Sequence, residues 1–201
     1  NAIAKSLKLN KDDEFISTNH IYGALDRTWQ YICDEKNAKF EKIKINFPIN
    51  SKKEFLEIFL NSITKNTKAI FISHLTSATA MIFPIKEIIN FAKKNNILTI
   101  IDGAHIPGHI DLDLKKIDPD IYVGACHKWM CTPKGVSFLY VKKELQEQVH
   151  PLIISWGWNS DNPGISKFLD WHEWQGTRDM SVFLTIPAAI NFLHENDWPT
   201  L

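Results

Sequence analysis

Two residues that could act together chemically, Asp102 and Lys128, each follow an apolar stretch that predicts a buried strand. An amine and a carboxylate at neighbouring strand ends match what pyridoxal phosphate requires of a protein. Lysine forms a Schiff base with the cofactor's aldehyde, and aspartate keeps the pyridine nitrogen protonated so that the ring can accept electrons. The pair therefore predicts chemistry at the Cα atom of an amino acid or beyond it.

Neither residue is specific when taken alone. Lys128 lies between His127 and Trp129, where partial burial and nearby positive charge would favour the neutral amine that attacks an aldehyde. A surface-loop lysine is the alternative. Asp102 could equally bind a metal or a ribose hydroxyl, or cap the next helix. The interpretation therefore depends on other polar groups gathering at the same place.

Polar side chains do follow several predicted strands. His20 comes after a strand predicted over 13–17, where it could stack on a flat ring or be a hydrogen-bonded loop histidine. Hydroxyl groups follow the strand predicted over 69–72, and His105 lies three residues after Asp102. Four successive strand ends with polar groups favour a ligand site more than any one of them does.

The sequence disfavours a metal site and a nucleotide site. His105 and His109 are four residues apart, but Pro107 and Gly108 lie between them, so they do not share a helical face and His109 is expected to be an ordinary loop residue. The zinc motif HExxH is missing, as are the phosphate loops GxxxxGKS/T and GxGxxG. Phosphate recognition must then come from a helix N-terminus or from loop hydroxyls.

The stretch Gly176–Asp179 is a candidate anion contact because it combines a flexible backbone, a hydroxyl and a guanidinium group. Its alternative is an N-cap of the following helix, supplied by Thr177 or Asp179. The preceding segment over 150–176 is rich in Trp, Asn, Gly and Pro. It predicts a long loop of the functional or interface-forming kind.

Composition limits the partners and the compartment. The 201 residues are 44% hydrophobic, and 23 basic side chains balance 23 acidic ones, so neither nucleic acid nor a membrane is an expected partner. No apolar run reaches the ~20 residues of a membrane-spanning helix. Three cysteines without a CxxC pair favour a reducing, cytoplasmic location. Because the sequence begins without Met and inside a predicted helix, we expect a piece of a longer protein.

The candidates are positioned by strands that alternate with helices. Strands are predicted over 13–17, 40–47, 69–72, 97–101, 121–123 and 136–141, and helices over 2–9, 23–34, 55–63, 84–95 and 180–195. Buried strands separated by helices favour a largely parallel sheet covered on both faces. Ligands bind such sheets beyond the carboxyl ends of the strands. The expected fold therefore places Asp102, His127 and Lys128 where a cofactor would lie.

Four segments make the chain resemble the class V aminotransferase family of fold-type I pyridoxal-phosphate enzymes. They are Thr18–Ala24, Ile101–His105, His127–Trp129 together with Pro133–Gly135, and Gly176–Asp179. Within the family the chain resembles the isopenicillin N epimerase-like branch, which is related to cysteine desulfurases. The resemblance covers essentially the whole chain. It implies a three-layer α/β/α large domain over 1–201 with a mostly parallel sheet, incomplete at both ends.

The resemblance implies roles for the residues nearest the cofactor ring. Lys128 would form the Schiff base and move a proton at the substrate's Cα atom. Asp102 would pair with the pyridine nitrogen, His105 would lie near the ring hydroxyl, and His20 would stack on the ring face.

Further implied roles concern the phosphate, the partner subunit and the substrate. The turn and loop residues involved would be His127 near the phosphate, Ser77 or alternatively Thr76 near the ring oxygen, and Gly176 and Thr177 near the phosphate of the partner subunit in a homodimer with shared sites. Arg178 would serve the dimer site or the substrate carboxylate.

Two departures from the family pattern concern what the chain lacks. Ala125 stands where related sequences carry a polar phosphate contact. The phosphate-binding turn and the small domain, with its substrate arginine and the desulfurase cysteine, are expected to lie outside this sequence. Cys126 and Cys131 are expected to be small buried hydrophobic residues rather than that nucleophile.

The expected function is a pyridoxal-phosphate-dependent enzyme that acts on an amino acid or a derivative through a Lys128 Schiff base. Epimerase-like or C–S lyase-like chemistry comes first, with an aminotransferase or a cysteine desulfurase as the alternative. A catalytically inactive fragment that serves as an interaction module is the alternative from another class. A nucleotide-binding domain of similar topology is disfavoured because no Gly-rich loop is present.

Overall fold

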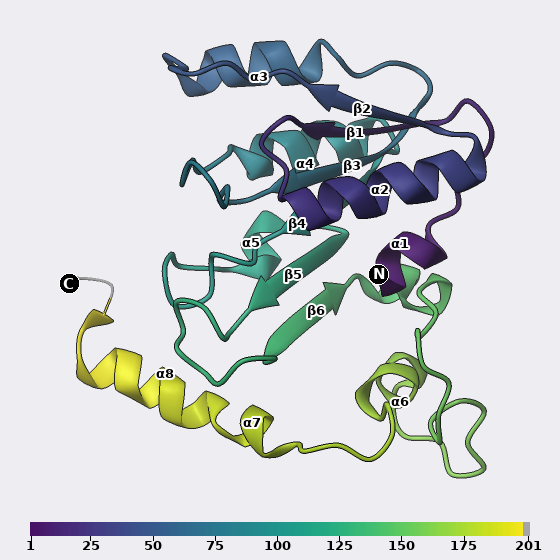
Figure 1. The fold of residues 1–201 in the computed structure, drawn as a ribbon, viewed down its shortest axis with the longest axis vertical. Helices are drawn as coiled ribbons and strands as arrows, with labels where there is room; N and C mark the ends of the chain where they lie inside the picture. The colour runs from purple at the N-terminus through teal and green to yellow at the C-terminus, as the bar shows by residue number, and fades with distance from the viewer. Residues whose placement is uncertain (199–201) are drawn as a thin grey trace.

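The computed structural model describes residues 1–198 and shows one sheet with helices against both faces (Figure 1). The six strands lie in the order β2-β1-β3-β4-β5-β6. They are β1 (Glu14–Thr18), β2 (Lys39–Ile43), β3 (Thr67–Ser73), β4 (Leu98–Asp102), β5 (Ile121–Ala125) and β6 (Ser137–Val141). Neighbours pair in parallel except β6, which runs antiparallel to β5. The predicted three-layer α/β/α fold with a mostly parallel sheet is confirmed.

Helices of different lengths cover the sheet. They are α1 (Ala2–Ser6), α2 (Gly23–Lys36), α3 (Lys52–Leu60), α4 (Ile85–Lys94), α5 (Leu114–Ile117), the 3₁₀ helix η1 (Lys143–Gln148), α6 (Lys167–Glu173), α7 (Ser181–Leu184) and α8 (Ile186–Glu195). One face of the sheet packs against α1 and α2, through Ile3 and Trp29. The other packs against α3 and α4, through Phe55 and Ile88. Within residues 1–198, none of these helices has the length and apolar character needed to cross a membrane.

The central strand β3 shows why the sheet has a core on each face. Ala69 and Phe71 belong to the cluster with α2, whereas Ile70 and Ile72 belong to the cluster with α4. Successive strand residues point to opposite faces, so an unbroken apolar run buries both. Burying one such side chain fully stabilises the fold by roughly 1.5–3 kcal/mol. The carboxyl ends of these strands are therefore held at fixed positions.

The edge strand β2 is shorter than predicted, because it ends at Ile43 rather than at 47. The alternating pattern continues in the sequence, but the backbone leaves the sheet. The side chain of Asn19 accepts a hydrogen bond from Ile45 N at 2.8 Å. A side-chain oxygen thus replaces the partner strand while Ile45 stays buried.

The C-terminal part of the chain differs from the prediction in two places. The loop predicted over 150–176 contains α6, whose N-cap Ser166 accepts a hydrogen bond from Leu169 N at 3.3 Å and which buries Trp171. The single helix predicted over 180–195 is divided into α7 and α8. Pro187 lies in the first turn of α8 and has no backbone N–H to donate to the preceding turn, which explains the break.

Candidate active site

The parallel strands β3, β4 and β5 have their carboxyl ends side by side. Ser73 of β3 lies opposite Asp102 of β4, and Asp102 lies opposite Val123 of β5. The pairing continues just beyond the strands, because His74 N donates to Asp102 O and Gly103 N donates to Val123 O, both at 2.8 Å. The backbone around Asp102 is therefore fixed from both sides.

The Asp102 carboxylate is partly buried at the end of β4. Its Oδ1 accepts a hydrogen bond from Ala104 N at 3.0 Å, while Oδ2 accepts none from residues 1–198. Burial raises the pKa of Asp102, although the Ala104 N–H and the positive charge of Lys128 act in the opposite direction. A cationic N–H donor stabilises a carboxylate in this state, and a protonated pyridine nitrogen is such a donor. The residues present thus fit the cofactor that the sequence predicts.

Lys128 and His105 meet next to this carboxylate. Lys128 Nζ lies 3.1 Å from His105 Nε2. On the other side of the imidazole, Trp129 Nε1 donates to His105 Nδ1 at 3.3 Å. Burial and the positive charge of Lys128 lower the pKa of His105. We call Asp102, His105, Lys128 and Trp129 the strand-end site.

The exposure of Lys128 differs from the sequence prediction, and a contact of His109 was not predicted. Lys128 is exposed rather than partly buried, and its amine lies against the imidazole of His105. His109 lies in an exposed turn, as expected for a loop residue, and its ring also stacks on Trp129 with centroids 4.3 Å apart. Its Nδ1 also lies 3.2 Å from His105 O. The sequence does show a Trp directly after Lys128. It does not reveal that this Trp contacts the turn that carries His105 and His109.

The sequence analysis missed a buried polar pair, His74 and Tyr122, which packs against the backbone next to Asp102. His74 Nδ1 lies 2.9 Å from the Tyr122 hydroxyl. Burial raises the pKa of Tyr122 and lowers the pKa of His74 to about 4, so both side chains stay neutral near pH 7. Gly103 passes directly over the Tyr122 ring, because a Cβ atom there would lie 2.1 Å from ring atoms. The sequence signal for this pair was Tyr122, a polar aromatic residue inside the otherwise apolar strand β5.

The two other predicted histidines make backbone contacts. His20 Nε2 lies 2.8 Å from Ile45 O, and its ring packs against Phe47 at a centroid distance of 4.4 Å. His127 is half-buried, and its Nδ1 lies 2.8 Å from Val136 O. His127 therefore ties the turn that carries Lys128 to the start of β6. His20 has no hydrogen bond to the strand-end site within the described part of the chain.

The two alternative hydroxyls after β3 differ in their surroundings. Thr76 is fully buried, and its hydroxyl lies 2.7 Å from that of Thr79. It also accepts a hydrogen bond from Met81 N at 2.9 Å, so it holds the turn together. Ser77 is exposed at the tip of the same turn. Of the two hydroxyls, only that of Ser77 is free of such structural bonds and accessible to a ligand.

The candidate anion contact lies in the exposed loop between α6 and α7. Gly176 has a φ of +100°, with open space where a side chain would be. Thr177 is exposed, and the guanidinium of Arg178 lies over the Phe183 ring at 5.3 Å from its centroid. Asp179, rather than Thr177, accepts a hydrogen bond from Ser181 N at the start of α7. The contacts of Arg178 and Asp179 are with residues of α7, and they do not reach the strand-end site within residues 1–198.

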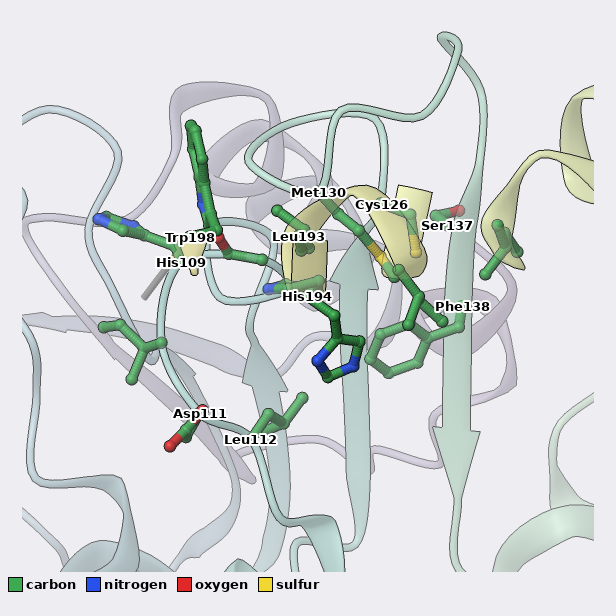
Figure 2. A pocket seen from close by; sticks show the side chains of 15 residues that line it. His109, Asp111, Leu112, Cys126, Met130, Ser137, Phe138, Leu193, His194 and Trp198 are labelled. Carbon is green, nitrogen blue, oxygen red and sulfur yellow. The ribbon is translucent and has the colours of Figure 1, made fainter. Parts of the chain in front are cut away.

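A cavity of about 520 Å³ lies beneath α8. Its walls include His109 and Met130 from the turns beside β5, and Leu193 and His194 from α8 (Figure 2). Asp102, His105 and Lys128 do not line it. Among residues 1–198, no three His, Cys, Asp or Glu side chains come together as metal ligands.

The cysteines near Lys128 differ from one another. Cys126 is buried, as expected, and lines the cavity beneath α8. Cys131 is exposed, contrary to the prediction, because its positive φ of 61° belongs to a tight turn at the surface. All three cysteines of the chain are free thiols.

Curated relatives match nearly the whole chain. Isopenicillin N epimerase of Streptomyces clavuligerus is 29% identical over 209 residues, which cover 97% of this chain and 52% of the relative. L-cysteine desulfhydrase of Arabidopsis thaliana is 26% identical over 195 residues, covering 93% and 42%. The chain thus spans about half the length of the curated relatives that it matches.

Solved structures share the fold. The cysteine desulfurase CsdA from Escherichia coli matches with a TM-score of 0.83 at 21% identity, covering 98% of this chain and 50% of that one. The cystine C–S lyase C-DES matches with a TM-score of 0.84 at 20% identity, covering 96% and 53%. The model of the family described as aminotransferase class-V matches residues 1–198. As the resemblance predicted, this chain belongs to the class V aminotransferase family.

Proposed function

We propose that the protein is a pyridoxal-phosphate-dependent enzyme that acts on an amino acid or a derivative, with residues 1–201 in its cofactor-binding large domain. One observation carries this proposal: the Lys128 amine and the His105 imidazole lie 3.1 Å apart, next to the Asp102 carboxylate, at the ends of adjacent parallel strands. One oxygen of that carboxylate has no hydrogen-bond partner among residues 1–198. When bound, the cofactor supplies a ring that stabilises negative charge at the substrate's Cα atom.

Each residue of the strand-end site has a task in this proposal. Asp102 accepts a hydrogen bond from the protonated pyridine nitrogen, and its burial strengthens that interaction. Lys128 binds the aldehyde covalently and afterwards carries a proton to or from the Cα atom. His105 lies at the ring hydroxyl. Ser77, rather than Thr76, contacts the ring oxygen, because the Thr76 hydroxyl is already bonded within its turn.

The remaining assignments are those that the family resemblance implies, and only the last of them involve a second subunit. His20 covers the ring face and His127 lies near the phosphate. Gly176 and Thr177 bind the phosphate of the partner subunit, and Arg178 serves the substrate carboxylate or the dimer contact. The exposed positions of Thr177 and Arg178 support a homodimer with shared sites. Three free thiols support a reducing compartment, which we propose to be the cytoplasm.

Epimerisation or C–S bond cleavage is the proposed reaction, with transamination or desulfuration as the alternative. The curated relatives include proteins named as an epimerase and as desulfhydrases. Two products separate the outcomes. Deuterium incorporation at Cα with inversion indicates an epimerase, whereas release of sulfide from L-cysteine indicates a lyase. Amino transfer to a 2-oxo acid without either product would favour the aminotransferase.

The test of the proposed function is covalent capture. The purified protein is expected to develop a visible absorption band with pyridoxal phosphate, and borohydride reduction followed by peptide mass spectrometry should place the adduct on Lys128. Lys128→Ala should lose both signals completely. Lys134→Ala, at an exposed lysine of the same turn, is the matched control and should keep them. Absence of the band in the unmodified protein, or an adduct on other lysines only, would contradict the proposal.

A further inference from the structure

The peptide group of Ile45 is bonded by two side chains instead of a partner strand. The parallel pairing of β1 and β2 ends at Thr18 and Ile43, and Asn19 N continues it with a hydrogen bond to Ile43 O at 3.0 Å. Beyond that point the Asn19 side chain takes over. Its Oδ1 accepts from Ile45 N at 2.8 Å, and its Nδ2 donates to Ile45 O at 3.4 Å. His20 Nε2 lies 2.8 Å from the same oxygen, so two consecutive side chains hold one peptide group.

The donors and acceptors at this peptide group have fixed directions. Ile45 N can only donate, so it must face the oxygen of the Asn19 amide, and the amide nitrogen then faces Ile45 O. A carbonyl oxygen can only accept, so His20 Nε2 carries a hydrogen and donates it. The Ile45 side chain is 1% exposed and belongs to the core that packs against α3 and α4. A main-chain oxygen anchored in the core therefore sets the orientation of the His20 imidazole.

Aromatic contacts restrict the His20 ring further. Its centroid lies 4.4 Å from that of Phe47, and the Phe83 ring stands nearly edge-on to it at 6.3 Å. Phe83 N donates to His74 O, and His74 N donates to Asp102 O. The His20 ring therefore lies at the same edge of the sheet as the Asp102 carboxylate. His20 is only half-buried, so part of its ring is accessible to a ligand.

We propose that Asn19 is a positioning residue, which fixes the Ile45 peptide group so that the Ile45 oxygen orients the His20 imidazole at the strand ends. Asn19 is itself exposed, and its side-chain hydrogen bonds within residues 1–198 all go to Ile45. A ring that is already held loses little further freedom when it stacks on a flat ligand, which favours binding. That this ligand is the cofactor ring rests on the proposed function, whereas the orientation of His20 does not.

The first measurement follows the amide hydrogen of Ile45 and needs no cofactor. Asn19→Ala removes the acceptor of this hydrogen, so its exchange with deuterated solvent should become roughly five- to tenfold faster, as expected for one lost hydrogen bond. Asn19→Asp keeps a side-chain oxygen and should keep the slow exchange. Asn46→Ala, at an exposed asparagine of the same segment, is the matched control and should leave it unchanged. The amide hydrogens of β3 should be unaffected in all three variants, which excludes a general loss of structure.

The second measurement is the tautomer ratio of His20. Ring ¹⁵N chemical shifts are recorded at about pH 9, above the range in which an ordinary histidine titrates, and are assigned by their loss in His20→Gln. The unmodified protein should show the Nε2–H form. In Asn19→Ala the Nδ1–H form should rise about fivefold relative to it, because the acceptor at Ile45 is no longer held in place. Asn19→Asp should retain the ratio of the unmodified protein.

The third measurement connects the His20 ring to the cofactor. Equilibrium dialysis should show that Asn19→Ala binds pyridoxal phosphate about fivefold more weakly than the unmodified protein. When His20→Ala is already present, the ring is gone and Asn19→Ala should weaken binding no further. A general loss of structure would instead weaken binding in both backgrounds. Circular dichroism checks that the variants fold.

The outcomes separate this proposal from the proposed function. Unchanged exchange of the Ile45 amide, or an unchanged tautomer ratio of His20, in Asn19→Ala would overturn the role of Asn19. Changes in both with unaltered affinity for pyridoxal phosphate, or an equal loss of affinity in both backgrounds, would overturn its effect on the cofactor. If the unmodified protein never binds pyridoxal phosphate but both cofactor-free signals change in Asn19→Ala, the proposed function fails and the positioning of His20 by Asn19 stands.

Discussion

The strand-end site and the segment over 150–180 both carry candidate functional residues, but only the first is held by the sheet. At the strand-end site, backbone hydrogen bonds of 2.8 Å fix the chain on both sides of Asp102. In the segment over 150–180, large apolar side chains face solvent, with Trp156 86% exposed and Ile165 fully exposed. Exposed apolar surface of this kind marks interfaces. The comparison teaches that one set of residues is organised by the sheet within the chain, whereas the other lies in a segment that exposes large apolar side chains to solvent.

The largest expected effect on stability concerns the buried support of the strand-end site. The pKa of His74 is lowered from 6.5 to about 4. Between these values the unfolded chain takes up a proton that the folded chain does not, so stability is lost as the pH falls from 6.5 towards 4. The linked free energy is on the order of 3 kcal/mol. The unfolding free energy, measured with denaturant, should therefore fall more between pH 7 and pH 4 in the unmodified protein than in His74→Asn.

The control for this prediction is His194→Asn, at an exposed histidine of α8. It should retain the acid sensitivity of the unmodified protein. Equal acid sensitivity in His74→Asn and the unmodified protein would show that His74 is not the buried neutral group described here.

A pair of glycine variants compares the two regions directly. A Cβ atom at Gly103 would collide with the Tyr122 ring, and such overpacking costs about 2–3 kcal/mol of unfolding free energy. A Cβ atom at Gly176 would meet no atom within 4 Å, so only its φ of +100° opposes a side chain, at a cost of about 1 kcal/mol. Thermal or urea unfolding of Gly103→Ala and Gly176→Ala measures both values. Equal losses would remove the distinction between the packed and the open region.

The smallest expected effects separate the two hydroxyls after β3. Thr76→Val removes the hydrogen bonds to Thr79 and Met81 and should lower the unfolding free energy by about 1–2 kcal/mol. Ser77→Ala should leave stability within about 0.5 kcal/mol. It should instead weaken pyridoxal-phosphate binding about fivefold, as expected for one hydrogen bond of about 1 kcal/mol. Equilibrium dialysis and urea unfolding of both variants test the assignment, and weakened binding in Thr76→Val alone would reverse it.

The elements that were predicted well are those whose burial leaves a pattern along the chain. The strands around Ile70 and Ile101 are apolar on both faces, so they were found within two residues of their observed bounds. Errors arose where a local interaction overrode the pattern. Asn19 draws the backbone out of β2, Ser166 caps a helix inside a predicted loop, and Pro187 divides a predicted helix.

For the candidate site, the sequence by itself determined which chemical groups leave the strand ends, because a parallel sheet brings its carboxyl ends to one edge. The proposed site residues Asp102, His105 and Lys128 follow from that rule. Only the tertiary structure decided which groups support them. The contact of Trp129 with His105 joins residues 24 apart, and that of Tyr122 with His74 joins residues 48 apart. These contacts depend on the order β3-β4-β5 and on the path of each following turn, which local sequence patterns do not encode.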